Sequence, residues 1–585
     1  MAAARRKPMP YPIVLQDAFK GFTFDQDKIC PPEETVGRLK ERLGRLNMDI
    51  LAHTRRIDNG RIGIPVYFSV CGKTAAAVTG TKKQMGKGAT DRQAEASAVM
   101  ELAERFSFFS FCKTPDNFFT NTMANLGPRA MPFERIALSV HDVSTEAEAL
   151  RPIVKSLPLR WTQAFNLTRQ QPELVPFDWF FTINEFNGPS AGNCVEEALC
   201  QGICEVVERH VSSIVSRNRL SVPAIDPDTA TDPAVVEMLA KYRRAGIKLY
   251  VSDFSLDTGI PTVGVLAYDP TTFPKSSEIV WTAGTTCDPQ KALSRALTEV
   301  AQLAGDFNSN ANYVASGLPK FTRLDQTDFI INCPSIRPIQ ALPDLSHPNI
   351  RVEVENLVGV LGARGLDVTA IDVTHAGLQV PAFYTIIPGA HFRERADGAS
   401  LGLFTAKLVT ETMPARAAAD ILAAIDQCLP DKYFVHFYRG LIHLNQSRYE
   451  QALGFFRSAL TLGPPDQEKA AIYSYLGVCL KQMDRFADAL VELEQGVAID
   501  AERTDIHNLM GFCHFKLKSH QQAIACFEKA IALNPSSAID YANIGANYRE
   551  LGDSAKAAAF FHLALDLDPG IDFARQGLER LKTDG

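Results

Sequence analysis

The sequence predicts a mixed α/β (α+β) domain followed by an all-α helical-repeat solenoid. The chain has 585 residues, enough for about three to four domain-sized units. Its 46% hydrophobic and 22% charged residues are ordinary for globular protein. Strand-like and helical patterns alternate in the first part, and only helical patterns follow. We therefore expect domains at residues 1–415 and 433–585, joined by a linker helix at 416–432.

The first part contains short strand-like runs between longer helical patterns. The strand-like runs are residues 64–70, 248–254, 262–269, 351–357 and 366–373. The helical patterns cover residues 33–47, 91–112, 193–217, 233–245, 289–305 and 351–364. Residues 351–357 fit both descriptions, so strand and helix stay open there. A further helix at 413–430 is expected to lead into the repeats.

An internal repeat begins near residue 433. Glycines recur at positions 440, 477, 511 and 545, and an alanine stands twelve residues after each, at 452, 489, 523 and 557. Two antiparallel helices that pack closely need small residues where they cross. The pattern resembles the tetratricopeptide repeat over about residues 430–585. That resemblance implies a surface that binds peptide or protein, or a second copy of the chain, and it implies no chemistry.

Charge and composition exclude several classes of protein. Sixty basic and 67 acidic side chains leave a formal charge of −7, so we expect no nucleic-acid partner and no anionic membrane partner, although a local basic patch stays open. No apolar run reaches about 18 residues, and the first residues lack the apolar segment of a secretory signal. Twelve scattered cysteines without a C-x-x-C pair indicate reduced thiols. We therefore expect a cytoplasmic protein.

Three otherwise apolar helical segments carry glutamates and arginines at helical spacing. They contain Ser97, Glu101, Glu104 and Arg105; Asn193, Glu197, Glu205, Glu208 and Arg209; and Arg295 and Glu299. Residues three or four apart lie on one side of a helix, so each set forms a polar stripe. A solvated helix face is the ordinary explanation of such a stripe. The apolar residues around these stripes leave little other polar surface to face water, which argues against it.

Six buried glutamates beside so few arginines need another source of positive charge. A buried carboxylate is costly unless a cation neutralises it or its pKa rises. Mg²⁺ takes oxygen ligands and commonly carries phosphates, whereas zinc would need His or Cys at close spacing. The stripes therefore predict a magnesium–phosphate site.

Three further features near the stripes have competing interpretations. The segment Gly80–Thr90 is rich in glycine and lysine, but its spacing does not fit a P-loop; a turn that lets Lys87 approach a phosphate fits better. Cys200 and Cys204 share a helix face, but we expect no third or fourth ligand near them, which favours reduced core thiols. His210 is a candidate general base, but a supporting, partly exposed position is favoured.

Four ordered motifs resemble those of the YcaO family. They are K-x-x-x-P-x-E-T at Lys28–Thr35, S-x-x-x-E-x-x-E-R at Ser97–Arg105, the long motif N-G-x-x-A-G-N-x-x-E-E-A-x-x-x-G-x-x-E-x-x-E-R at Asn187–Arg209, and R-A-L-x-E at Arg295–Glu299. The resemblance implies ATP binding without a P-loop, with Mg²⁺ between carboxylates and phosphates. It makes Glu101, Glu104, Glu205 and Glu208 the candidate metal ligands. Nucleotide contacts are expected from Lys28, Thr35, Lys87, Ser97, Asn193, Glu197, Arg209, Arg295 and Glu299.

The resemblance also implies a reaction. Family members use ATP to phosphorylate the oxygen of a peptide amide, and a nucleophile then attacks the carbon, giving an azoline with a side chain or a thioamide with sulfide. The chain ends in LERLKTDG rather than the proline-rich tail common in azoline-forming members, which favours thioamidation or an accessory role in methylthiolation of a small-subunit ribosomal protein. A scaffold acting through its repeats is the alternative. The expected partners are a peptide or protein substrate and a second copy in a homodimer.

Overall fold

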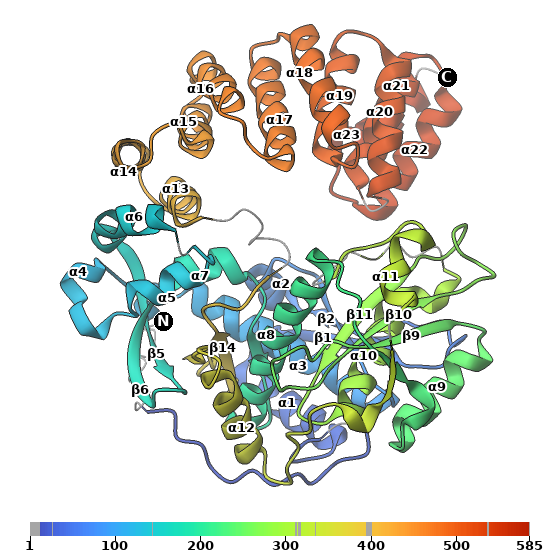
Figure 1. Cartoon of the computed structure of the whole chain (residues 1–585). Coiled ribbons are helices and arrows are strands. Elements are labelled where there is room, and N and C mark those ends of the chain that lie inside the picture. The colour runs from blue at the N-terminus through green and yellow to red at the C-terminus, as the bar shows by residue number, and fades with distance from the viewer. Residues whose placement is uncertain are drawn as a thin grey trace. The chain divides into compact units, whose positions relative to one another are not determined.

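The computed structural model describes residues 12–25, 27–142, 144–309, 313, 318–333, 335–392, 400–534 and 537–583. Residues 1–11, at which a secretory signal was considered, lie outside the described residues. The chain forms two compact units (Figure 1). The α/β unit comprises Met1–Ser144 and Val154–Ser400, and the repeat unit comprises Thr145–Ile153 and Leu401–Gly585. The predicted order of a mixed α/β part and a helical-repeat part is confirmed. The bounds 1–415, 416–432 and 433–585 stay a prediction.

The described residues of the α/β unit form three sheets. The first is antiparallel, in the order β1 (Leu51–Arg56), β2 (Val66–Cys71), β3 (Lys83–Lys87). The second has the order β11 (Val280–Thr285), β10 (Thr262–Tyr268), β9 (Lys248–Asp253), β8 (Ala224–Asp226), β12 (Ile336–Pro338), with only β8 and β12 parallel. The third has the order β4 (Phe119–Asn121), β5 (Leu159–Asn166), β13 (Thr369–Asp372), β14 (Ala382–Ile386), β7 (Pro189–Ala191), and β6 (Gln171–Pro176) pairs with β5.

Three long helices connect these sheets. Helix α3 (Asp91–Lys113) packs on β2 and β3 of the first sheet and on β7 and β14 of the third. Helix α8 (Val195–Arg217) packs on β7 and β14 and also on β11 of the second sheet. Helix α10 (Pro289–Ala304) packs on β10 and β11 and on β3. Each helix therefore spans two sheets, and the three predicted stripes lie on helices at the centre of this unit.

Shorter helices complete the α/β unit. They are α1 (Pro32–Leu46), α2 (Lys73–Thr79), α4 (Met123–Leu126), α5 (Phe133–Leu138), α7 (Phe177–Asn184), α9 (Pro233–Arg244), α11 (Asp328–Ile331) and α12 (Ile350–Gly362), and residues 154–156 of α6 (Thr145–Ser156) also belong here. Helix α12 decides the open choice at 351–357 in favour of a helix. The Asn349 side chain accepts a hydrogen bond from the Arg351 amide and so caps a run whose valines also suit a strand.

Apolar packing fixes the positions of α3 and α10. Val99 and Leu102 of α3 are buried against Val36 and Leu39 of α1. A larger cluster joins Leu293 and Leu297 of α10 to buried valines of β9, β10 and β11. Because the apolar faces of these helices are used in packing, their polar stripes are held in fixed directions.

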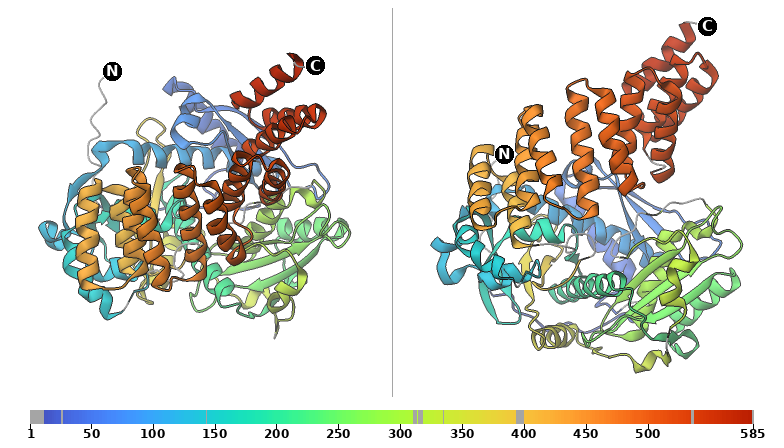
Figure 2. Two further views of the ribbon diagram at one scale, coloured as in Figure 1. Left: turned by 90° about the horizontal axis from the view of Figure 1, so that it is seen from above. Right: turned by 45° about the horizontal axis from the view of Figure 1, so that its top comes forward.

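The repeat unit consists of helix pairs stacked side by side (Figure 2). After α13 (Leu401–Thr412) and α14 (Ala415–Cys428), the pairs are α15 (Tyr433–Asn445) with α16 (Tyr449–Thr461), α17 (Asp466–Gln482) with α18 (Phe486–Ile499), α19 (Thr504–Lys516) with α20 (His520–Leu533), and α21 (Ala538–Glu550) with α22 (Ser554–Leu567), and α23 (Asp572–Thr583) follows. Among the residues described in either unit, we find no helix with the length and apolar character needed to span a bilayer.

The repeated glycines lie where the two helices of a pair touch. A Cβ atom on Gly440 would come within 2.6 Å of Phe456, and one on Gly511 within 2.7 Å of Phe527. Gly477 faces Leu493, and Gly545 faces Phe561, in the same way. The four repeated alanines are fully buried. Small residues at the helix crossings are therefore confirmed, and each glycine faces a large side chain sixteen residues further along the chain.

Candidate active site

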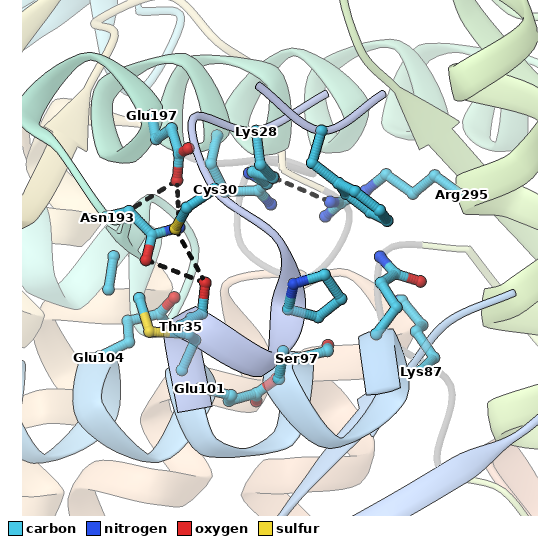
Figure 3. A pocket seen from close by; sticks show the side chains of 18 residues that line it. Lys28, Cys30, Thr35, Lys87, Ser97, Glu101, Glu104, Asn193, Glu197 and Arg295 are labelled. Carbon is cyan, nitrogen blue, oxygen red and sulfur yellow. Dashed lines mark hydrogen bonds between the residues drawn. The ribbon is translucent and has the colours of Figure 1, made fainter. Parts of the chain in front are cut away.

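Helix α3 and the first turns of α8 present polar side chains to a common cavity. Helix α3 begins at Asp91, where the Thr90 side chain accepts a hydrogen bond from the Gln93 amide. Since its other faces are packed, Glu101 and Glu104 point away from the core (Figure 3). The exposed fraction of the Glu101 side chain is 36%, against 16% for Glu104. The stripe on α3 therefore faces a hollow rather than bulk solvent.

The structure brings nine of the thirteen predicted site residues to this hollow, which we call the carboxylate cavity. They are Lys28, Thr35, Lys87, Ser97, Glu101, Glu104, Asn193, Glu197 and Arg295. The cavity has a volume of about 180 Å³, which is room for roughly a dozen water-sized groups. Acidic side chains from α3 and α8 thus lie in one cavity with basic side chains from β3, α10 and the N-terminal segment.

Glu197 connects three parts of the cavity wall. Its Oε2 accepts hydrogen bonds from the backbone amide of Asn193 at 2.9 Å and from the Asn193 side chain at 3.0 Å. Its Oε1 accepts a bond from the Ile29 amide at 2.7 Å, which ties the segment carrying Lys28 to α8. The Thr35 hydroxyl donates to Asn193 Oδ1 at 3.0 Å. Glu197 is therefore a buried carboxylate that positions neighbouring groups.

The other four predicted residues, Glu205, Glu208, Arg209 and Glu299, do not line the cavity. Glu208 is buried and accepts bonds from the Thr285 amide at 3.1 Å and from Arg295 Nε at 3.3 Å. Arg209 lies 3.9 Å from Glu205 and 4.0 Å from Glu208. Glu299 pairs with Lys87. Glu208 and Glu299 thus contact residues that line the cavity, and Arg209 links Glu205 to Glu208.

Burial sets the protonation of several of these groups. It raises the pKa of Glu104 and of Glu205 above the usual range, although Arg105 lowers the pKa of Glu104 and Arg209 lowers that of Glu205. Burial, helped by the Arg295 guanidinium, lowers the pKa of Lys87 to about 7, while Glu208 and Glu101 favour the charged ammonium. Without a bound cation, the site therefore disfavours having all of its glutamates ionised at once.

The donor set fits magnesium and phosphate. Carboxylate oxygens are the ligands that Mg²⁺ prefers, and a divalent cation would lower the raised pKa values of Glu104 and Glu205. Lys28, Lys87 and Arg295 line the same cavity and suit phosphate oxygens. The Arg295 fork is already oriented, because it also donates to Gln201 Oε1 at 3.0 Å.

Two residues of the cavity wall are not among the predicted site residues. Gln201 and Cys30 line the carboxylate cavity. Gln201 lies one turn after Glu197 on the same helix face, so helical spacing could have found it. The expected glycine-rich turn before α3 is wrong in part, since β3 occupies Lys83–Lys87. Gly86 in this strand touches α3: a Cβ there would lie 2.0 Å from the Ala98 nitrogen.

The thiol pair on α8 and His210 differ in how well they match the predictions. A third thiol does lie near Cys200 and Cys204: Cys287 comes from the segment between β11 and α10, so the absence of a third ligand was wrong. All twelve cysteines are free thiols. His210 Nδ1 accepts a hydrogen bond from the backbone amide of His391 at 2.9 Å, and burial lowers its pKa to about 4. His210 does not line the carboxylate cavity and has a packing role in this structure.

Family comparison agrees with the fold and the cavity. A family model described as YcaO cyclodehydratase, ATP- and Mg²⁺-binding, matches residues 85–391, and tetratricopeptide-repeat models match residues 413–467, 504–537 and 541–571. The chain belongs to the YcaO family and carries C-terminal tetratricopeptide repeats. It thus has the fold of an ATP-dependent cyclodehydratase-like enzyme, and ATP and Mg²⁺ are confirmed as the cofactors that the sequence predicts.

Individual relatives cover different parts of the chain. An uncharacterised protein of Methanothermobacter thermautotrophicus is 28% identical over 382 residues, which are 61% of this chain and 93% of the relative. The ribosomal protein S12 methylthiotransferase accessory factor YcaO of Escherichia coli is 29% identical over 242 residues, or 38% of this chain and 40% of that protein. A solved heterocyclase in complex with substrate and cofactor is 24% identical, with a TM-score of 0.54, and the match covers 65% of this chain and 55% of the heterocyclase. This last likeness concerns the fold alone.

Proposed function

We propose that the protein uses ATP and Mg²⁺ to phosphorylate the carbonyl oxygen of a peptide backbone amide, as the first step of thioamidation or azoline formation. The observation that carries this proposal is the carboxylate cavity, in which Glu101 and Glu104 share one hollow with Lys28, Lys87 and Arg295. Mg²⁺ would be held by Glu101, Glu104, Glu205 and Glu208, and when bound it would offset charge on the phosphates.

The remaining side chains would bind and orient the nucleotide. Lys28 and Lys87 supply positive charge for phosphate oxygens, and Arg295 offers a fork already fixed by Glu208 and Gln201. Glu197 holds Asn193 and the Ile29 amide in place, so it fixes the segment that would cover the nucleotide. Ser97, Thr35, Arg209 and Glu299 complete this proposed binding set.

The chemistry needs an activated amide because an amide oxygen is a poor leaving group. Transfer of the γ-phosphoryl group to that oxygen forms an O–P bond and releases ADP. A nucleophile then adds to the carbon, and the C–O bond breaks as phosphate departs with the electron pair. Positioning and electrostatic stabilisation supply most of the catalysis in such phosphoryl transfers.

We further propose that the repeat unit recruits the substrate protein or a second copy of the chain, as in the expected homodimer, and that the protein acts in the cytoplasm. An accessory role in methylthiolation of ribosomal protein S12 is the alternative, favoured by the likeness to the Escherichia coli factor. The two functions differ in a measurable way. An accessory factor changes S12 modification in cells without forming a thioamide or azoline in the purified reaction.

Titration calorimetry with ATP and Mg²⁺ tests the nucleotide site. The double variant Glu101→Gln/Glu208→Gln should bind at least about tenfold more weakly than wild type, because it removes one carboxylate from each acidic stripe. Glu237→Gln is the matched control, since Glu237 is an exposed carboxylate on α9 that pairs only with Arg244 among the contacts described. Equal binding by the double variant and wild type would refute the proposed site.

Oxygen labelling tests the reaction. With ¹⁸O in the backbone carbonyl of a substrate peptide, the label should appear in the released phosphate together with the modified amide. Modified product with unlabelled phosphate would contradict O-phosphorylation of the amide.

A further inference from the structure

Three cysteine sulfurs gather beside the carboxylate cavity. Cys200 and Cys204 stand one turn apart on α8, and Cys287 comes from the loop that follows β11. The three sulfur atoms all lie within 4.8 Å of one another. Cys204 and Cys287 are buried, and Cys200 is partly buried. The loop thus brings a third thiol to a pair already aligned by the helix.

The sulfur spacing favours one shared ion over a disulfide. Cys200 Sγ lies 3.9 Å from Cys287 Sγ, far beyond the roughly 2.05 Å of a disulfide bond. Two thiolates on one tetrahedral zinc ion, each at about 2.3 Å, stand about 3.8 Å apart. The observed separation therefore fits two ligands of a single ion.

A second cavity opens at these sulfurs. It has a volume of about 60 Å³, which holds a few water-sized groups, and all three cysteines line it. Lys28, Glu197 and Gln201 line both this cavity and the carboxylate cavity. The thiols therefore lie directly behind the wall of the proposed nucleotide site.

The carboxylates of the second cavity already have partners. Glu353 Oε1 accepts bonds from Lys20 Nζ at 2.7 Å and from the His347 amide at 3.0 Å. Asp288 caps α10, and its Oδ1 accepts a bond from the Gln290 amide at 2.7 Å. A metal held by the three thiols would thus keep its fourth position for a ligand from the cavity.

We propose that Cys200, Cys204 and Cys287 bind a single zinc ion whose fourth coordination position opens into the cavity behind the ATP site. Three thiolates are a soft ligand set that zinc accepts, and an open fourth position is the arrangement of reactive rather than structural zinc sites. Lys28 lines the cavity and offsets part of the net negative charge of three thiolates around a divalent ion, whereas Lys291, which also lines it, is paired with Asp232 at 2.8 Å.

The open position suits a small sulfur nucleophile, and this part rests on the proposed function. Hydrosulfide held there would form a C–S bond at the phosphorylated amide carbon. The C–O bond would break, phosphate would leave with the electron pair, and the proton of the S–H group would pass to phosphate, leaving a thioamide. No oxidant or reductant is consumed.

Metal analysis of the full chain tests the site. Wild type, purified under reducing conditions and titrated with zinc, should hold one ion per chain and bind Co²⁺ with the absorption bands of tetrahedral thiolate coordination. Cys200→Ser and Cys287→Ser should each weaken zinc binding by at least about 100-fold. Replacing a residue that only supports a metal ligand typically weakens binding by about 10- to 100-fold, so a larger loss indicates a direct ligand. Cys112→Ser on α3 is the matched control and should bind as wild type does.

Four results would overturn the assignment: no bound zinc in wild type, equal zinc in the serine variants, iron with sulfide in place of zinc, or a Cys200–Cys287 disulfide that persists in protein purified under reducing conditions. The outcome is separable from that of the proposed function. Glu101→Gln/Glu208→Gln should bind ATP more weakly and keep zinc. Zinc-free wild type that still binds ATP would remove this inference and leave the proposed function intact.

Discussion

The long helices of the α/β unit and the paired helices of the repeat unit use their buried faces differently. Helix α8 buries Glu196, Glu197 and Glu208. The second helices of the repeats, such as α20 and α22, bury alanine, phenylalanine and other apolar or small residues. Buried carboxylates lower stability unless they are compensated, so they are retained where a ligand uses them. Packing alone accounts for the buried residues of α20 and α22, whereas the buried carboxylates of α8 indicate a binding site.

The largest expected difference between the units comes from their glycines. A Cβ on Gly86 would lie 2.0 Å from the Ala98 nitrogen and 2.4 Å from the Ala94 oxygen, and these backbone atoms of α3 cannot move aside. Gly86→Ala should therefore lower the free energy of unfolding of the α/β unit by about 3 kcal/mol. In Gly511→Ala the new Cβ meets the Phe527 ring, which can tilt, and alanine also favours the helix, so the net change should stay within about 1 kcal/mol.

Tryptophan fluorescence measures the first of these effects separately. Trp161, Trp179 and Trp281 are the three tryptophans of the chain, and all are buried in the α/β unit. Denaturant unfolding followed by this signal reports the α/β unit, while circular dichroism also includes the repeats. Equal losses of stability in the two variants would contradict the distinction between backbone and side-chain contacts.

A smaller effect is expected from histidines of the α/β unit. Burial, with the nearby His141 ring, lowers the pKa of His210 and of His391 to about 4. Between pH 4 and 6.5 the unfolded chain binds more protons at these positions, so the free energy of unfolding should fall as the pH drops through this window. We subtract the free energy of unfolding of wild type from that of His391→Gln at each pH. This difference should be higher at pH 5 than at pH 7.5 by on the order of 1 kcal/mol, because the variant lacks one buried histidine that takes up a proton on unfolding.

The same fluorescence signal, followed in urea at both pH values, checks this prediction. The raised pKa values of Glu104 and Glu205 act in the opposite direction but are common to both proteins, so they cancel in the difference. A difference between variant and wild type that does not change with pH would refute the assignment to His391.

Helical periodicity explains how much of the site could be predicted. Glu101 and Glu104 had to share a face of α3 because residues three apart do so in any α-helix. Cys287 could not be placed beside Cys200, because the two thiols meet only through the packing of α8 against β11. The local pattern at 351–357 suits a strand and a helix equally, and the Asn349 cap, together with packing of α12 on α8, decides between them.

Thermal unfolding with and without ATP and Mg²⁺, followed by tryptophan fluorescence, tests most directly the claim that ligand stabilises the buried carboxylates. At a ligand concentration about 100 times the wild-type Kd, the α/β unit should gain about 2.7 kcal/mol, whereas Glu101→Gln/Glu208→Gln, which should bind at least about tenfold more weakly, should gain no more than about 1.4 kcal/mol. An equal rise of the midpoint in that variant, or no rise in wild type at saturating ATP and Mg²⁺, would contradict the account.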